Sequence, residues 1–299
     1  MKGNPKQKNK PILLIDGNNL LYRCYYKFSG MVSKKGKPSS MVFGYPYTLR
    51  SLLNRFEPKE VYNVFDGGRD RKRMEILPTY KEREQKLGFD IDDFREQKQV
   101  VMDLLTNMNL RVIWERYKEA DDLIYILVRK LSKNNKVIIV SSDKDFNQLV
   151  NENVTIFNPH QGVIVTHKNM LRRFGYTPEE CVDYLILDGD KSDNIPGYKG
   201  MGPKRIRDFL NKHSSIKNYL KVGATYKNIN NALLVDLVKL NKHLIDLAYF
   251  FRKNHRKYKL PNYGPEPKFN KDHIYNVSSK YDINTFIKPN FQKPFKAIR

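Results

Sequence analysis

The stretch Ile12-Leu13-Leu14-Ile15-Asp16 decides the fold, because four consecutive apolar residues that end on a carboxylate predict a buried strand leading into a polar site. Two further apolar runs follow the same pattern: residues 61–65 directly precede Asp66, and two residues separate the run 137–140 from Asp143. In an open α/β sheet, residues just past parallel strands meet in one crevice at the carboxyl edge. We therefore expect these three carboxylates to lie close together.

Nine carboxylates fall in five short clusters along the chain. So many acids in one crevice would repel one another and raise their own pKa values. Divalent cations relieve that repulsion. Mg²⁺ or Mn²⁺ takes oxygen ligands, keeps several waters and usually takes phosphate oxygens of the substrate as further ligands. The candidate metal-site residues are Asp16, Asp66, Glu119, Asp121, Asp122, Asp143, Asp145, Asp190 and Asp193.

The composition points to a polyanionic partner. Across 299 residues, 55 Lys and Arg stand against 32 Asp and Glu, a formal net charge of +23. Self-repulsion at this charge destabilises a compact protein unless a polyanion is its usual partner. An acidic pocket on a basic protein therefore indicates metal-assisted phosphodiester chemistry on nucleic acid.

The two cysteines and the lengths of the apolar runs bear on the compartment. Cys24 and Cys181 cannot build a disulfide framework, and their helical surroundings predict buried free thiols in a reducing compartment. No apolar run in the sequence approaches the length of a membrane span. We expect a soluble monomer without a membrane partner, located in the cytoplasm, or in the host cytoplasm if a phage encodes it.

Strands alternating with helices predict an α/β fold with a mostly parallel sheet in the first half, followed by a mainly helical second half. A boundary is expected near residues 174–175. Residues 250–299 contain five prolines. We interpret the basic tail, from residue 252 onward, as a strand-and-loop appendage or as partly disordered. Helices are expected at 19–28, 42–56, 90–108, 119–131, 177–187, 203–212 and 230–251, strands at 111–114 and 136–140, and a hairpin at 155–165.

Seven motifs occur in a fixed order and carry a family resemblance over about residues 10–250. In that order they resemble the 5′-3′ exonuclease and flap endonuclease family, most of all its free-standing bacteriophage members. The motifs are Ile12-Leu13-Leu14-Ile15-Asp16-Gly17-Asn18-Asn19 with Tyr22-Arg23, Val64-Phe65-Asp66-Gly67, Leu77-Pro78-Thr79-Tyr80-Lys81, Glu119-Ala120-Asp121-Asp122, Ser142-Asp143-Lys144-Asp145, Gly189-Asp190-Lys191-Ser192-Asp193-Asn194-Ile195-Pro196-Gly197, and Gly200-Met201-Gly202-Pro203-Lys204.

The resemblance implies a PIN-like catalytic domain over residues 1–174, in which a helical arch spans about residues 67–108. A helix-three-turn-helix domain, of the helix-hairpin-helix type, would follow at 175–251, and a basic extension at 252–299. The resemblance also implies two Mg²⁺ ions, for which Mn²⁺ can substitute. One ion would be held by Asp16, Asp66, Glu119 and Asp121, and the other by Asp143, Asp145 and Asp193, with Asp121 between the two and Asp122 and Asp190 acting through water.

The same resemblance implies roles for basic and aromatic residues near the cut. Lys81 and Arg83 would stabilise charge on the scissile phosphate. Tyr80 would stack on a base, and Arg23 would contact a phosphate. The family places its arch arginine three residues after the lysine, a position that Glu84 occupies here. A charged loop without such a role is the alternative for the segment from Arg69 to Lys86.

Duplex binding is expected at a glycine-rich turn that opens a helix. Glycines let the backbone approach phosphate, and amides at a helix N-terminus bind it. In the family this turn also holds a potassium ion through backbone oxygens. The predicted DNA contacts are Lys199, Gly200, Gly202, Lys204 and Arg205 at the turn, with Arg69, Arg71, Lys72 and Arg73 at the base of the arch.

The leading hypothesis is a metal-dependent, structure-specific 5′ nuclease that cuts near single-strand/duplex junctions. Expected partners are DNA with a 5′ flap or junction, RNA–DNA hybrids, and a single-strand-binding protein or other replication proteins. Its role would be the removal of RNA primers or flaps during DNA replication. Two alternatives remain open: a non-catalytic nucleic-acid-binding scaffold, and a PIN-type ribonuclease that acts on folded RNA.

Overall fold

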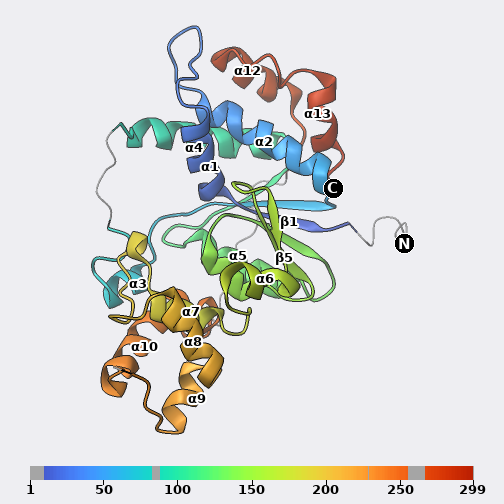
Figure 1. Ribbon diagram of the computed structural model, residues 1–299. Helices are drawn as coiled ribbons and strands as arrows, with labels where there is room; N and C mark the ends of the chain where they lie inside the picture. The colour runs from blue at the N-terminus through green and yellow to red at the C-terminus, as the bar shows by residue number, and fades with distance from the viewer. Residues whose placement is uncertain (1–9, 83–87, 228, 255–266, 299) are drawn as a thin grey trace.

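The computed structural model describes residues 10–82, 88–227, 229–254 and 267–298 (Figure 1). Within this part of the chain a six-stranded sheet has the order β3-β2-β1-β4-β5-β6. The first five strands in that order run parallel, and β6 pairs antiparallel with β5, so the predicted mostly parallel sheet and its terminal hairpin are both confirmed. The strands are β1 (Ile12–Asp16), β2 (Glu60–Val64), β3 (Arg111–Ile113), β4 (Val137–Val140), β5 (Val154–Asn158) and β6 (Val163–Val165).

Strand β1 lies in the middle of the sheet, between β2 and β4, and both of its faces are covered. All five of its residues are buried, as expected for a parallel strand between two helical layers, which reads as a continuous apolar run. Its side chains alternate between two cores: Leu13 and Ile15 pack in one, and Ile12 and Leu14 pack in the other. This alternation leaves Asp16 at the strand's carboxyl end.

One face of the sheet is covered by α1 (Gly17–Lys27), α2 (Ser40–Phe56) and α4 (Ile91–Asn107) (Figure 1). Two further helices, α12 (Lys271–Tyr281) and α13 (Pro289–Lys296), lie outside this layer and pack on α4 and α2. The interpretation of the tail as a strand-and-loop appendage was therefore wrong for the described residues 267–298. Apolar side chains such as Ile274 and Phe295 bury the tail in the same core.

The other face is covered by α5 (Ala120–Leu131), and its core continues without interruption into the helical second half. That half contains α7 (Cys181–Asp188), α8 (Pro203–His213), α9 (Ile216–Lys221), α10 (Asn231–Ile245) and α11 (Leu247–Asn254). The short α3 (Arg71–Ile76) lies against α10. Helices α6 (His167–Phe174) and α9 were not predicted, and the expected helix at 230–251 is two helices that meet at Asp246.

Both cysteines are free and buried, as expected. In the described part of the chain, the structure contains no helix with the length and apolar character needed to cross a membrane.

Candidate active site

The strand ends bring the acids together, and local capping fixes each one. Asp16 ends β1 and caps α1, since its Oδ1 accepts from the Asn19 amide at 3.1 Å. Asp143 follows β4 and caps a 3₁₀ helix (Lys144–Leu149) by accepting from the Asp145 amide at 2.9 Å. This capping draws the turn after β4 into helical geometry.

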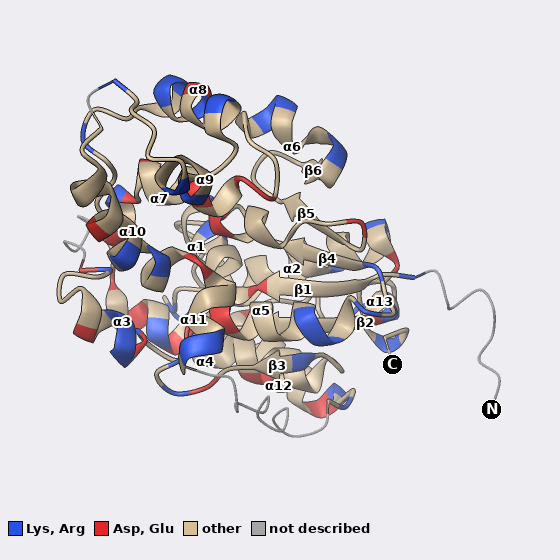
Figure 2. Cartoon of the chain, turned by 90° about the horizontal axis from the view of Figure 1, so that it is seen from below, with Lys and Arg blue, Asp and Glu red and all other residues tan. Residues whose placement is uncertain are grey.

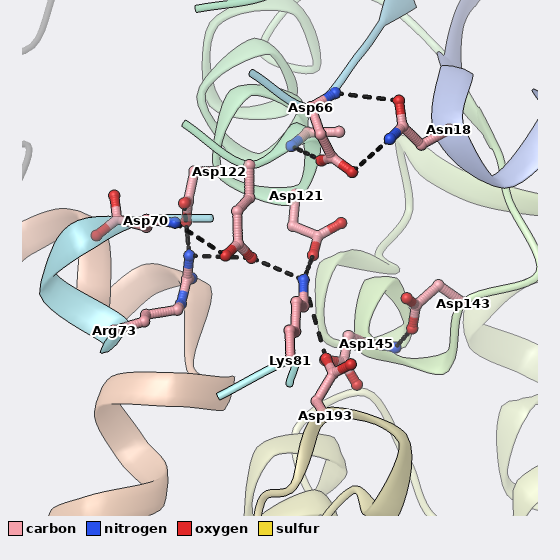
Figure 3. Close-up of polar contacts among 12 residues, drawn as sticks. Asn18, Asp66, Asp70, Arg73, Lys81, Asp121, Asp122, Asp143, Asp145 and Asp193 are labelled. Atoms are coloured by element: carbon pink, nitrogen blue, oxygen red, sulfur yellow. Dashed lines mark hydrogen bonds and ion pairs between the residues drawn. The ribbon is translucent and has the colours of Figure 1, made fainter. Parts of the chain in front are cut away.

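Two polar residues that sequence reasoning did not assign to the site hold its first two carboxylates. The Asn18 amide donates to Asp66 Oδ2 at 2.7 Å, and the Ser141 hydroxyl donates to Asp16 Oδ2 at 2.7 Å (Figure 3 shows the Asn18 contact). The backbone amide of Ala120, at the start of α5, donates to Asp66 Oδ1 at 2.7 Å. Asn18 lies within the first motif, two residues after Asp16, so the sequence could have indicated its place in the site. Ser141 directly follows β4, which is a weaker indication of a site residue.

The carboxylates raise one another's pKa values, so they form one cluster. Burial raises the pKa of Asp16 to about 7, and the charges of Asp66 and Asp143 add to the effect. Burial also raises the pKa of Asp121 well above its usual range, with further contributions from Asp143, Asp16 and Asp66. The predicted convergence of carboxylates from three strand ends and from α5 is therefore present, as is the predicted repulsion.

The donor set of this acidic cluster fits a hydrated divalent ion. Among the described residues, no three His, Cys, Asp or Glu side chains are grouped closely enough to bind one ion by themselves. Mg²⁺ does not need such a cage, because it keeps several waters and uses one or two carboxylates together with substrate phosphates. All of the donors are hard carboxylate oxygens that repel one another, which suits Mg²⁺ or Mn²⁺ better than a closed zinc site.

Lys81 is a cation at the centre of this acidic cluster. Its Nζ lies 2.8 Å from Glu119 Oε2, 3.8 Å from Asp121 Oδ2 and 3.9 Å from Asp193 Oδ2 (Figure 3). Its backbone amide also donates to the Asp193 carbonyl at 3.1 Å. Lys81 therefore joins the base of the arch to α5 and to the turn after α7.

Asp190 and Asp145 extend the acidic cluster towards that turn. Burial raises the pKa of Asp145 well above its usual range, and Asp143 and Asp190 add to the effect. Asp190 accepts from the Ser192 amide at 2.8 Å and lies 3.7 Å from Lys144 Nζ. These contacts outweigh burial and lower the pKa of Asp190.

Three expectations for the arch are corrected by burial. Arg73 is 1% exposed and makes a two-pronged ion pair with Asp122, at 2.7 and 2.9 Å, so it is not a DNA contact. Both carboxylate oxygens of Asp122 accept from Arg73, so the predicted action of Asp122 on a metal through water is also corrected. Tyr80 is 2% exposed and donates its hydroxyl to Glu119 Oε2 at 2.9 Å, so it does not present its ring to a base here.

The other predicted arch residues remain on the surface. Arg69 donates to the Tyr80 carbonyl at 3.1 Å, Arg71 stacks on Tyr117, and Lys72 pairs with Glu75 at 2.8 Å. Arg83 lies outside the described residues, so its predicted role stays a prediction. Arg23 on α1 contacts His160 at the tip of the β5–β6 hairpin at 3.2 Å.

The glycine-rich turn has the predicted backbone and exposure. Gly200 has φ +83°, a conformation that L side chains rarely adopt, and Pro203 occupies the first turn of α8 after Gly202. Lys199 and Lys204 are exposed. Arg205 Nη1 donates to the Gly200 carbonyl at 2.8 Å, so a guanidinium already bonds to one backbone oxygen of this turn.

Comparison with known proteins follows the same division of the chain. Residues 11–175 match the 5′-3′ exonuclease N-terminal resolvase-like domain, and residues 176–254 match the 5′-3′ exonuclease C-terminal SAM fold. The chain belongs to the 5′-3′ exonuclease family. A 5′-3′ exonuclease of Aquifex aeolicus is 35% identical over 213 residues, which cover 71% of this chain and 73% of the relative. One from Buchnera aphidicola subsp. Schizaphis graminum is 34% identical, covering 72% and 74%.

Solved structures share the fold. The T5 D15 protein, co-crystallised with metal ions, aligns with a TM-score of 0.67 at 20% identity over 95% of this chain and 98% of that one. Flap endonuclease-1 from Methanococcus jannaschii aligns with a TM-score of 0.58 at 17% identity over 97% and 92%. The sequence-based assignment to the 5′-3′ exonuclease and flap endonuclease family is confirmed, and membership gives the chain a hydrolase activity.

Removing metal should make stability fall as pH rises. The pKa of Asp16 rises from 3.8 to about 7 on folding. Between those values the folded state binds more protons than the unfolded state, so the free energy of unfolding decreases as pH increases. Melting in chelator at about pH 5 and about pH 7 should give the higher midpoint at the lower pH. Mg²⁺ should raise the midpoint more at about pH 7. Equal midpoints in chelator would argue against carboxylates whose pKa values are raised in the folded state.

Proposed function

We propose that this protein is a divalent-metal-dependent 5′ nuclease that hydrolyses phosphodiesters near the junction of single-stranded and duplex DNA. The observation that carries the proposal is the carboxylate cluster around Lys81, set in a protein with a net charge of +23. Lys and Arg positions recur along α6 and α8, and Asp and Glu positions lie along the chain near α5 and α7 (Figure 2). Basic residues on α8 suit phosphate binding, and the carboxylates around Lys81 suit metal binding.

The proposed metal ligands are drawn from Asp16, Asp66 and Asp121 for one ion and from Asp143, Asp145 and Asp193 for the other, with water and substrate phosphate as further ligands. Glu119, predicted as a ligand of the first ion, is not among them, because its carboxylate accepts from Lys81 and from the Tyr80 hydroxyl at 2.8 and 2.9 Å. When bound, a pair of Mg²⁺ ions would supply a hydroxide nucleophile and stabilise the leaving oxygen. Residues of the chain position the cation and orient the carboxylates. Glu119 holds Lys81 within the acidic cluster at 2.8 Å, where its ammonium can neutralise charge on a phosphate that enters. The Asn18 and Ser141 contacts keep the Asp66 and Asp16 carboxylates oriented.

The finer assignments of substrate and setting belong to the same proposal. We propose Mg²⁺ as the working metal and DNA with a 5′ flap as the substrate. RNA–DNA hybrids, as an RNase H activity, would also be cleaved, in primer removal during DNA replication. A bacteriophage origin would place the protein in the host cytoplasm, with a single-strand-binding protein as a partner. A potassium ion at the glycine-rich turn would have to share or displace the Arg205 contact.

The test is a DNA duplex with a labelled 5′ flap, incubated with protein plus Mg²⁺ or plus chelator, with products mapped to the nucleotide. Mg²⁺-dependent cleavage within about a nucleotide of the junction is the expected result. Tight binding without cleavage would favour the scaffold alternative. Parallel substrates, an RNA–DNA hybrid and an RNA hairpin, separate the proposal from a PIN-type ribonuclease, which would prefer the hairpin.

Replacing Lys204 with Ala should weaken duplex binding and flatten its dependence on salt. Lys204 is exposed in the first turn of α8, where backbone amides and a lysine can bind phosphate together. Losing one phosphate contact reduces the slope of log affinity against log salt by about one. The measurement is fluorescence anisotropy of labelled duplex across a salt series. Lys239→Ala, which removes an exposed lysine of α10 paired with Asp236, is the matched control. An unchanged slope for Lys204→Ala would contradict the phosphate contact.

A further inference from the structure

Arg73 is buried among three partners, two at the start of α5 and one on α11. It lies on α3, and its side chain is 1% exposed. Its Nη1 and Nη2 donate to the two oxygens of Asp122 on α5, at 2.7 and 2.9 Å (Figure 3). Since both carboxylate oxygens are engaged, the planar guanidinium has one orientation relative to the first turn of α5.

The same guanidinium reaches a member of the acidic cluster. Arg73 Nη1 lies 3.5 Å from Glu119 Oε2, the oxygen that also accepts from the Tyr80 hydroxyl and from Lys81. The other oxygen of Glu119 accepts from the Asp70 amide, at the start of α3, at 3.2 Å. Although burial alone would raise the pKa of Glu119, Arg73 and Lys81 lower it. The Glu119 carboxylate is thus held by Asp70, Arg73, Tyr80 and Lys81 of the arch base.

The third partner of Arg73 comes from the far end of the described helical half. Phe250 of α11 is fully buried, and its ring lies beneath the guanidinium, with Arg73 Cζ 3.9 Å from the ring centroid. A cation over an aromatic face is attracted electrostatically, more so where water is excluded. Because α11 also packs on α5, it supports both Arg73 and the helix that carries Asp122.

We propose that Arg73 is a positioning residue through which Phe250 on α11 fixes Glu119, and with it Lys81, relative to the catalytic carboxylates. This rests on the proposed function and deepens it, since it makes the helical half a support of the active site as well as a DNA-binding element. The geometry favours this role over a purely stabilising one. A buried ion pair with Asp122 alone needs neither the contact with Glu119 nor an aromatic ring from another part of the fold.

Neighbouring phenylalanines on α11 allow a matched test. Phe250→Leu removes the ring under Arg73 and touches no carboxylate. Phe251→Leu makes the same change one residue away, where the ring contacts Tyr125 and Arg129 instead. We expect Phe250→Leu to lower kcat on the 5′-flap substrate about tenfold, with KM for DNA unchanged, and to weaken Mn²⁺ binding about tenfold. Phe251→Leu should match the wild type in all three quantities. Mn²⁺ affinity is read without DNA by electron paramagnetic resonance.

A double variant separates positioning from stability and does not depend on how Phe250→Leu folds. Arg73→Met with Asp122→Leu removes both charges of the buried pair, so neither is left uncompensated, and such replacements keep stability near that of the parent. Glu119 retains Tyr80, Lys81 and the Asp70 amide. We expect a parental melting midpoint, intact DNA binding, and a loss of about 10- to 100-fold in kcat and in Mn²⁺ affinity.

The outcomes are distinguishable. Parental kcat and Mn²⁺ affinity in both Phe250→Leu and the double variant would overturn the positioning role and leave the nuclease function standing. A wild-type protein that binds the flap substrate but does not cleave it would overturn the proposed function itself. Reduced Mn²⁺ affinity in Phe250→Leu at an unchanged melting midpoint would support the proposal, because a stabilising contact alone would not move it.

Discussion

Asp143→Asn should abolish turnover, with a loss of about 10³-fold or more, and leave DNA binding largely intact. The variant is a clean test because Asn and Asp cap helices about equally well. The Asp143 carboxylate caps the 3₁₀ helix by accepting from the Asp145 amide at 2.9 Å, and an Asn side-chain oxygen can accept the same bond. Burial, with the charges of Asp193 and Asp190, raises the pKa of Asp143. A neutral side chain should therefore not destabilise the metal-free fold.

The measurements are single-turnover cleavage of the labelled flap at saturating Mg²⁺, and duplex binding by anisotropy. Asp236→Asn is the matched control. It makes the same change at an exposed residue, 3.4 Å from Lys239, in a surface pair that contributes little to stability. Cleavage by Asp143→Asn at a rate near that of the wild type would remove Asp143 from the metal ligands.

The acidic cluster was predictable because its position depends on local sequence. An apolar run followed by a carboxylate fixes both a strand and the edge at which its acid lies, and parallel pairing brings those edges together. The parallel pairing of β1 with β2 sets Asp16 opposite Val64, two residues before Asp66, and so brings the two acids close together. Helix capping is local in the same way: Asp90, before α4, accepts from the Asp92 and Asp93 amides.

The direction of the basic side chains could not be read from the sequence. Arg69, Arg71, Lys72 and Arg73 form one basic run, yet only Arg73 is buried. Its burial depends on Asp122, which is 49 residues away, and on Phe250, which is further still. Long-range partners of this kind decide whether an arginine binds phosphate or a carboxylate. Tyr80 was misassigned for the same reason.

The tail carried a readable signal that its composition obscured. Ile274, Val277 and Tyr281 are spaced three and four residues apart, and Phe291 and Phe295 are four apart, which is the spacing of an apolar helical stripe. All five side chains are buried in the core shared with α2 and α4. Prolines and lysines at the solvent face masked this pattern, because net composition does not distinguish one face of a helix from another.

Lys81 is a cation that three acids of the site share. Its side chain is 22% exposed, so part of it remains accessible from solvent. A phosphate bound at the acidic cluster would add negative charge where carboxylates already repel one another. The Lys81 ammonium, between Glu119, Asp121 and Asp193, is the positive charge that the described residues place among them. In a site from which water is partly excluded, such a charge stabilises a transition state strongly.

Lys81→Met should slow the chemical step by about 10²- to 10³-fold and change duplex affinity little, because α8 and its turn are untouched. Methionine keeps the length of the side-chain stem, and the backbone bond from residue 81 to the Asp193 carbonyl is independent of the side chain. Glu119 would still be held by Arg73 and the Tyr80 hydroxyl. Rates come from single-turnover cleavage at saturating Mg²⁺, with Lys130→Met, at an exposed position near the end of α5, as the control for loss of one positive charge. If both variants cleave at the rate of the wild type, the ammonium has no part in catalysis and serves only to neutralise the metal-free acidic cluster.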